Sequence, residues 1–411
     1  MKKTFRKLHL WLSVPTGIII TLVCFSGAML VFEKEITEAI KPELYFVKEA
    51  KGEPIPMQEL MEKVEETLPD SVSISGVTVF ADSIRTYQVS LTKPRRASIY
   101  VNQYTGEVTG RSERLPFFDV MFHLHRWLMG SSSGVGKLLT GICTLVLVYI
   151  LITGILMWLT NRHKPLKASL AIHVTKGWGR FWHDLHVAGG IYATIFLLAM
   201  ALTGLTWSFS WYRTGFYACF GVESSEKGGA HGEGGDTHRE GRGSRGDGRN
   251  NHEGKRGEGR GERRGGEFYH GGGYHEGGFH EGGYGYHRRS PYRYWDDVLH
   301  EVALKNPGYQ QITLKPEVAE VVPDGRLSMR ATDKYSYDRR SGEITDVQLY
   351  SAEKKDTKVR GGVYMVHTGS WGGIITRILS FLAALIGATL PLTGYWLWFR
   401  RKRAATAHRI K

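Results

Sequence analysis

Four long stretches without any charged residue constrain this chain more than any other feature of its sequence. They hold 23, 23, 26 and 22 residues and occupy positions 10–32, 138–160, 187–212 and 378–399. A bilayer core about 30 Å thick is crossed by about 20 apolar residues in a helix. The sequence therefore predicts four transmembrane helices and excludes a soluble globular protein.

The distribution of charge predicts how these helices are oriented. Segments 1–8, 161–182 and 400–411 together carry 15 Lys and Arg residues and no Asp or Glu, in a chain of net charge +14. The positive-inside rule places all three segments, and so both termini, in the cytoplasm. These short basic segments explain the positive charge, so we expect no nucleic-acid partner. The first apolar run is too long for a signal-peptide core, which predicts a retained helix.

A glycine-rich tract at 221–290 has the opposite character. It contains 24 of the 51 glycines, 7 of the 17 histidines, 12 basic and 12 acidic residues. Such a segment buries too little apolar surface to offset its chain entropy, which predicts disorder. Its degenerate His-Glu-Gly-Gly motif at 274–284 is compatible with weak metal binding or with a solvated linker, and both interpretations stay open.

The segments outside the membrane have the same order of elements twice. The first has helical spacing over 57–68, alternation over 86–91 and 98–101, and a turn at 104–108. The second has helical spacing over 295–303, alternation over 311–314 and 327–331, and a turn at 340–344. The sequence thus predicts two small α+β modules, and a four-helix transmembrane bundle built from two parallel helix–domain–helix repeats.

This organisation gives the predicted domain boundaries. They are 1–36 for the first transmembrane helix, 37–116 for the first external module, 117–162 for an interfacial segment with the second helix, 163–182 for a cytoplasmic loop, 183–213 for the third helix, 221–290 for the glycine-rich tract, 291–352 for the second external module, 364–400 for the fourth helix and 401–411 for a cytoplasmic tail.

Four histidines recur at matching places in the two repeats. His9 and His186 lie at the cytoplasmic ends of the first and third helices, and His125 and His367 precede the second and fourth on the opposite side. Ser-Gly or Thr-Gly pairs mark the same helices, at 26–27, 153–154, 203–204 and 393–394. Two levels with two imidazoles each suit two bis-histidine haems, which favour electron transfer over oxygen chemistry.

Other interpretations of these residues remain. The histidines could be interfacial residues without a ligand, or a proton relay, although no Asp or Glu lies inside a span to continue one. His123 competes with His125 as a ligand, and His183 competes with His186. Near the outer pair, the residues that could pair with haem propionates or simply anchor the helices at the interface are Arg126, Lys137 and Arg377.

These histidines, the Thr-Gly pairs and the turns at 104–108 and 340–344 resemble the PepSY-associated transmembrane family. The resemblance covers nearly the whole chain except 221–290, and Ser26-Gly27 departs from it conservatively. It implies PepSY-like external modules in a protein of the bacterial cytoplasmic (inner) membrane that is linked to iron uptake. Some relatives are di-haem reductases that release iron from ferric siderophores outside the membrane.

The function predicted from sequence is transmembrane electron transfer. Two b-type haems would carry electrons from the His9/His186 level to the His125/His367 level, and so to a ferric siderophore or another ferric chelate. The chain has no strand-linked Gly-x-Gly-x-x-Gly fingerprint, so the electron donor would be a quinol or a separate reductase. The alternative is a non-enzymatic PepSY-type binding or peptidase-modulating membrane protein.

Overall fold

The computed structural model describes residues 2–50, 52–94, 97–160, 166–222, 290–326 and 328–410. Nearly all of the glycine-rich tract predicted at 221–290 lies outside the described residues, and so do the two interpretations of its His-Glu-Gly-Gly motif.

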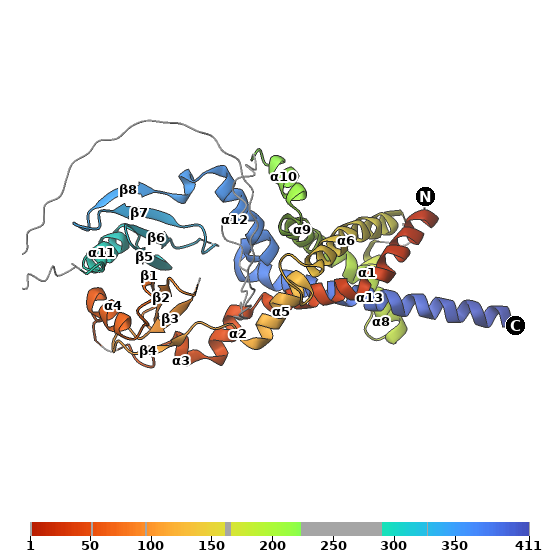
Figure 1. Cartoon of the computed structure of the whole chain (residues 1–411). Coiled ribbons are helices and arrows are strands. Elements are labelled where there is room, and N and C mark those ends of the chain that lie inside the picture. Colours follow the sequence, from red (N-terminus) through yellow and green to blue (C-terminus); the bar gives the residue numbers. More distant parts are fainter. Residues whose placement is uncertain are drawn as a thin grey trace, which may run out of the picture. The chain divides into compact units, whose positions relative to one another are not determined.

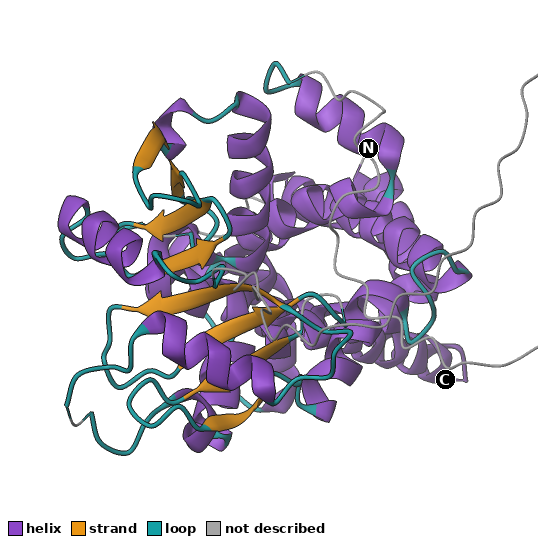
Figure 2. Cartoon of the chain, turned by 60° about the vertical axis from the view of Figure 1, so that its left-hand side comes forward, coloured by secondary structure: helices purple, strands orange, loops and turns teal. Residues whose placement is uncertain are grey.

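Four helices are long and apolar enough to cross a membrane, in agreement with the four uncharged stretches. Their elements are α1 (Lys2–Leu30), α6 (Val135–Thr160), α8 (Trp178–Asp184) continued by the π-helical turn η1 (Leu185–Gly189) and by α9 (Gly190–Ser208), and α13 (Gly373–Ile410). α1 packs against α6 and α13, and α9 packs against the same two helices (Figure 1). Figure 2 shows the helices in purple and the strands in orange. Helices that are apolar on all sides suit a lipid environment, in which the backbone is satisfied within each helix.

Small side chains allow these helices to approach closely at mid-bundle. Ala193, Ala383 and Ala388 belong to the buried cluster there. A Cβ added to Gly387 would lie 2.8 Å from a Leu197 methyl group. Close packing of small residues is the usual means of helix association in lipid, where the hydrophobic effect is absent.

Two shorter helices precede α6 and α13. They are α5 (Pro116–Trp127), which lies at the start of the predicted range 117–162 where an interfacial segment is expected, and α12 (Lys355–Thr368). α5 packs on α1 and α6, and α12 packs on α9. Each ends in a left-handed residue, Leu128 (φ 49°) and Gly369 (φ 73°), which turns the chain back toward the next spanning helix. The remaining short elements are α2 (Glu33–Ile40), α3 (Pro42–Tyr45), α7 (Leu166–Ser169), α10 (Ser210–Ala218), η3 (Tyr350–Ala352) and η4 (Ser370–Gly372).

The two segments predicted to lie outside the membrane form one eight-stranded antiparallel sheet with the order β4-β3-β2-β1-β5-β6-β7-β8. Its strands are β1 (Ile74–Phe80), β2 (Tyr87–Leu91), β3 (Ser98–Val101), β4 (Val108–Arg111), β5 (Gln311–Lys315), β6 (Val318–Val322), β7 (Asp333–Tyr337) and β8 (Ile344–Gln348). Each half is a four-stranded meander preceded by one helix, α4 (Met57–Glu66) or α11 (Trp295–Lys305). Both helices pack on the sheet and share one buried core with it (Figure 1).

The sequence predicts two separate modules, whereas in the structure the two halves form one sheet through the pairing of β1 with β5. Val77 is the register partner of Leu314, and Val79 that of Ile312. Without this pairing, each meander would expose an additional edge strand with unpaired backbone groups. A contact between the two helices adds to the junction: the Asp296 carboxylate accepts a hydrogen bond from Met57 N at 2.8 Å, at the start of α4.

One predicted strand is wrong. Of the alternation at 327–331, Leu327 lies outside the described residues. Residues 328–331 fall in the connection between β6 and β7, where Ser328 Oγ accepts a hydrogen bond from Arg330 N at 3.2 Å. The Ala331 amide donates to the Ser328 carbonyl at 3.0 Å. Such local bonds compete with a sheet ladder, so an alternating pattern alone did not produce a strand.

Candidate functional site

Each of the four recurring histidines is held by a helix other than its own. His367, one residue before the end of α12, donates from Nδ1 to the Met200 carbonyl of α9 at 2.9 Å. The Thr203 hydroxyl lies 3.4 Å from the same nitrogen and donates to the same carbonyl at 3.1 Å. The ring is therefore fixed by one carbonyl and the hydroxyl three residues after it.

The same arrangement holds His125 and His186. His125 Nδ1 lies 2.9 Å from the Val23 carbonyl, to which Ser26 donates at 3.1 Å. His186 Nδ1 lies 3.1 Å from the Leu390 carbonyl and 2.9 Å from Thr393 Oγ1. In each case the carbonyl lies three residues before the Ser or Thr of a Ser-Gly or Thr-Gly pair.

His9, which lies on α1, is held in the same way by α6. Its Nδ1 lies 3.1 Å from Thr153 Oγ1, and the Ile150 carbonyl also forms a hydrogen bond with the ring. Thr153 donates to that carbonyl at 2.9 Å. All four rings therefore rest on the same local motif, supplied by α1, α6, α9 and α13.

The glycine that follows each hydroxyl residue leaves room for the imidazole. A Cβ added there would lie 2.7 Å from the ring Cε1 at Gly27, 3.0 Å at Gly204, 3.4 Å at Gly394 and 3.8 Å at Gly154. The contact is tightest for His125 on Gly27 and loosest for His9 on Gly154. Any larger side chain at Gly27 would require the His125 ring to move.

These hydrogen bonds also determine which ring nitrogen is available to a ligand. A carbonyl only accepts hydrogen bonds, so the Nδ1 atoms that face carbonyls carry the proton. In a neutral imidazole, Nε2 then presents its lone pair, which is the state a metal requires. Metal-binding histidines in proteins usually donate their other N–H to a carbonyl or carboxylate in this way.

The structure brings the histidines together in the two predicted pairs. The ring centres of His125 and His367 are 6.0 Å apart, with 51° between the ring planes. Two imidazoles that bind one metal through Nε2 have ring centres roughly 6 Å apart, because each metal–nitrogen bond is about 2 Å. His9 and His186 lie close enough for their charges to interact.

The donor set fits a haem better than a bare metal ion. Within the part of the chain that the structure describes, no group of three or more His, Cys, Asp or Glu side chains is arranged around a common point. Two imidazoles alone leave most positions of a metal ion without protein ligands. A porphyrin supplies four nitrogen ligands itself, so a pair of axial imidazoles completes its coordination.

The competing histidines have other partners. His123 Nδ1 lies 2.9 Å from the Asp119 carbonyl on its own helix, and the ring packs edge-on against Trp127. His183 Nδ1 lies 3.3 Å from Asp184 Oδ1. The structure pairs His125, and not His123, with His367.

The three candidate propionate partners differ in their surroundings. The Arg126 guanidinium lies over the rings of Phe122 and Trp127, and its charge is within range of His125 and His367. Lys137 lies in the first turn of α6. Arg377 binds Glu35, with Nη2 2.8 Å from Oε2, and also donates to the Val31 carbonyl.

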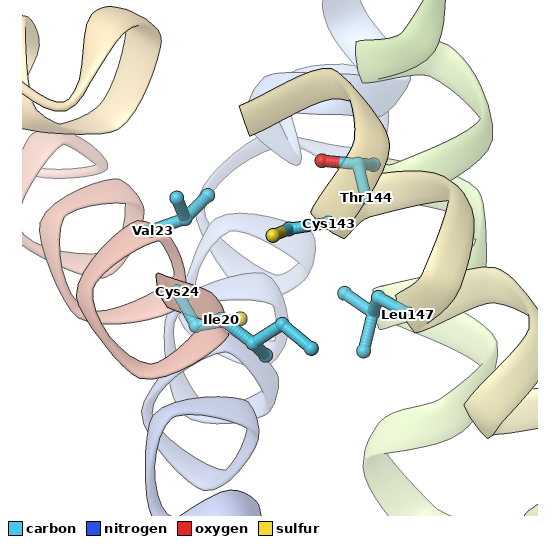
Figure 3. Close-up of a pocket in the computed structure, with 6 residues that line it drawn as sticks. All are labelled: Ile20, Val23, Cys24, Cys143, Thr144 and Leu147. Atoms are coloured by element: carbon cyan, nitrogen blue, oxygen red, sulfur yellow. The ribbon is translucent and has the colours of Figure 1, made fainter. Parts of the chain in front are cut away.

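A small apolar hollow lies between α1 and α6, near the outer histidine pair. Its lining residues are Ile20, Val23, Cys24, Cys143, Thr144 and Leu147 (Figure 3). It adjoins Val23, whose carbonyl holds His125. No ring of the four histidines lines it, so it is separate from the candidate site.

The sequence identified the Ser-Gly and Thr-Gly pairs but not what they do. From the sequence alone, each pair is associated only with the helix that carries it or that follows the histidine. In the structure, Ser26, Thr153, Thr203 and Thr393 instead serve histidines on other helices. A signal was available in the sequence, because the pairs and the histidines are equal in number.

Comparison with known proteins identifies one family. The sequence profile described as the PepSY-associated TM region matches residues 6–401, a range that contains all four histidines and confirms the family resemblance. No curated protein matches the chain.

Proposed function

Since the chain belongs to the PepSY-associated transmembrane family, we propose that it is a haem-containing oxidoreductase of the bacterial cytoplasmic membrane. It moves electrons outward across the membrane and reduces a ferric chelate, such as a ferric siderophore, to release ferrous iron. The ferric chelate is the substrate, and the biological role is iron acquisition.

The observation that carries this proposal is the pairing of His125 with His367 at 6.0 Å, with both Nδ1 atoms bonded to carbonyls. These two residues would hold the outer haem, and His9 with His186 would hold the inner one. When bound, a b-type haem would supply one-electron transfer.

The other residues near the outer pair have positioning roles. The carbonyls and hydroxyls described above fix the orientation of each ring, so that its Nε2 is available to a metal in one orientation. Arg126 suits a propionate because its guanidinium carries a charge beside both rings. Arg377 is a weaker candidate, since its guanidinium is already bound to Glu35.

The orientation in the membrane follows from the charge distribution. The basic segments at both termini and at 161–182 lie in the cytoplasm, so the chain contains two parallel helix–domain–helix repeats. The His9/His186 pair then lies on the cytoplasmic side and receives electrons first. The external sheet lies on the same side of the membrane as the chelate.

Haem quantification on the purified protein tests this function. We expect two b-type haems per chain with a low-spin spectrum, and the loss of one haem in His125→Ala and in His367→Ala. His123→Ala is the matched control and should keep both, because His123 faces its own helix. A colourless wild-type protein would contradict the proposal and favour a non-enzymatic PepSY-type binding protein.

A further inference from the structure

A buried carboxylate with three basic partners lies beside the inner histidine pair. Asp184 is 4% exposed and ends α8. Its Oδ2 is 2.8 Å from Arg180 Nε and 2.8 Å from His173 Nδ1, and its Oδ1 is 3.3 Å from His183 Nδ1. The backbone N–H of His173 also donates to Oδ2, at 3.3 Å. Helix capping alone does not require two side-chain imidazoles and a guanidinium.

His173 is oriented as a proton acceptor. Its Nδ1–H donates to Asp184, so the lone pair lies on Nε2, on the other side of the ring. The side chain is not fully buried, with 28% of its surface exposed. An imidazole held at Nδ1 by a carboxylate is a common general base, because the carboxylate stabilises the imidazolium that forms.

The surroundings of His173 favour a lipid-soluble ligand. Its neighbour Val174 is 73% exposed, and Trp178 is 74% exposed at the start of a membrane-crossing helix. Trp178 stacks on Trp182, with ring centres 6.0 Å apart. Exposed aromatic side chains are frequent at the membrane–water interface, and aromatic faces stack favourably on a flat ring.

The cluster is also next to the proposed electron acceptor. Asp184 precedes His186 by two residues, and the helix changes from α to π geometry between them, at η1. Insertions of π geometry are frequent at functional sites because they alter the direction of side chains. A ligand on His173 would therefore be close to the inner histidine pair.

We propose that His173 and Asp184 form a quinol-oxidation site, an inference that rests on the proposed function. A membrane quinol donates a hydrogen bond from its hydroxyl to His173 Nε2. Oxidation breaks both O–H bonds of the quinol and yields a quinone, two protons and two electrons. The protons leave one at a time through His173 Nε2 to water, and two ferric chelates each take one electron.

Reduction of the purified holoprotein by two different reductants tests this site. Decylubiquinol or menadiol should reduce the haem rapidly, as followed by its absorption spectrum. His173→Gln should lower the rate of that reduction by about 10²-fold, the usual contribution of a general base. Glutamine keeps an N–H donor for Asp184 but accepts no proton. Dithionite, which needs no such site, should reduce both proteins equally. His300→Gln, an exposed histidine on α11, is the matched control.

Wild-type protein gives a second test that does not depend on the folding of a variant. A quinolone N-oxide, which mimics a quinol, should block reduction by quinol and leave reduction by dithionite unchanged. Holoprotein that quinol does not reduce, or a His173→Gln variant that quinol reduces at the wild-type rate, would overturn the quinol site. Absence of haem from the wild-type protein would instead overturn the proposed function.

Discussion

At the scale of single residues, the histidine rings are held by backbone and glycine contacts. One carbonyl fixes the direction of each ring, and a hydroxyl bonded to the same carbonyl reinforces it. The following glycine sets how closely the ring can approach the helix. The four glycines differ in this respect, and the difference makes their substitutions informative.

Alanine substitutions at these glycines should form a graded series. Gly27→Ala should displace His125 and remove or weaken one proposed haem, because the new Cβ would lie 2.7 Å from Cε1. Gly154→Ala should be tolerated, because the corresponding distance to His9 is 3.8 Å. Haem content and the low-spin spectrum of the two variants measure this. Equal haem loss in both would contradict a steric role for the glycine.

The sequence pattern pairs two histidines that the structure brings together, but it does not show what holds them. Duplicated spacing was enough to identify His125 and His367 as a pair. The partners of their Nδ1 atoms, Val23 and Met200, are backbone carbonyls. Every residue has a carbonyl, and the position of these carbonyls three residues before a Ser-Gly or Thr-Gly pair is recognised only once the structure shows that they face the histidines. Only the packing of the helices decides it.

At the scale of elements, Arg377 joins α13 to the end of α1 and to α2. It binds Glu35 of α2 and the Val31 carbonyl next to α1. The hydrogen bond from Arg377 holds the pKa of the Glu35 carboxyl below its usual value, against partial burial. A carboxyl with a lowered pKa in the folded state stabilises the fold above its unfolded pKa, and this contribution is lost as pH falls through the folded pKa.

Glu35→Gln should therefore lower stability at neutral pH and have no effect in acid. The expected loss is under about 1 kcal/mol, because the pair is partly exposed to solvent. The unfolding temperatures of variant and wild type should converge as the pH falls below about 4. Thermal unfolding in detergent across this range measures it, with the exposed Glu43→Gln as control. A difference that persists in acid would show that another interaction was lost.

Element prediction succeeded for the two helices that pack on the sheet and for some strands, and failed for other strands. α4 begins at Met57 and α11 at Trp295, where the helical spacing of apolar residues begins. β3 matches its predicted range, Ser98–Val101. β6 (Val318–Val322) was not predicted. It is a strand because it pairs with β5 in the sheet, and not because its own residues alternate. The strand expected at 327–331 was wrong because local hydrogen bonds to Ser328 compete with a sheet ladder there.

At the scale of the whole molecule, each half of the chain holds its own histidines but pairs them with those of the other half. His125 is held by α1 of the first half, and His367 by α9 of the second, yet their rings face one another. The β1–β5 pairing joins the same two halves outside the helices. In the proposed function, each haem is therefore shared between the halves, and neither half alone has a complete site.

This arrangement predicts how paired substitutions behave. His9 and Gly27, which contacts His125, are 18 residues apart on α1, a separation of roughly 27 Å along the helix. One metal cannot bind both His9 and His125 across that length. We expect His9→Ala, His186→Ala and the double variant to lose the same single haem, because one missing ligand already disables the site.

His9→Ala combined with His125→Ala should instead disturb both haems, because the two ligands belong to different pairs. Pyridine-haemochrome content counts the haems, and electron paramagnetic resonance shows which low-spin signal remains. His123→Ala on the His9→Ala background is the control, and should keep the outer signal, since His123 bonds the Asp119 carbonyl. A His9→Ala/His125→Ala protein with one intact low-spin haem would mean that ligands pair within a half. The 6.0 Å separation of His125 and His367 argues that the pairing is across the halves.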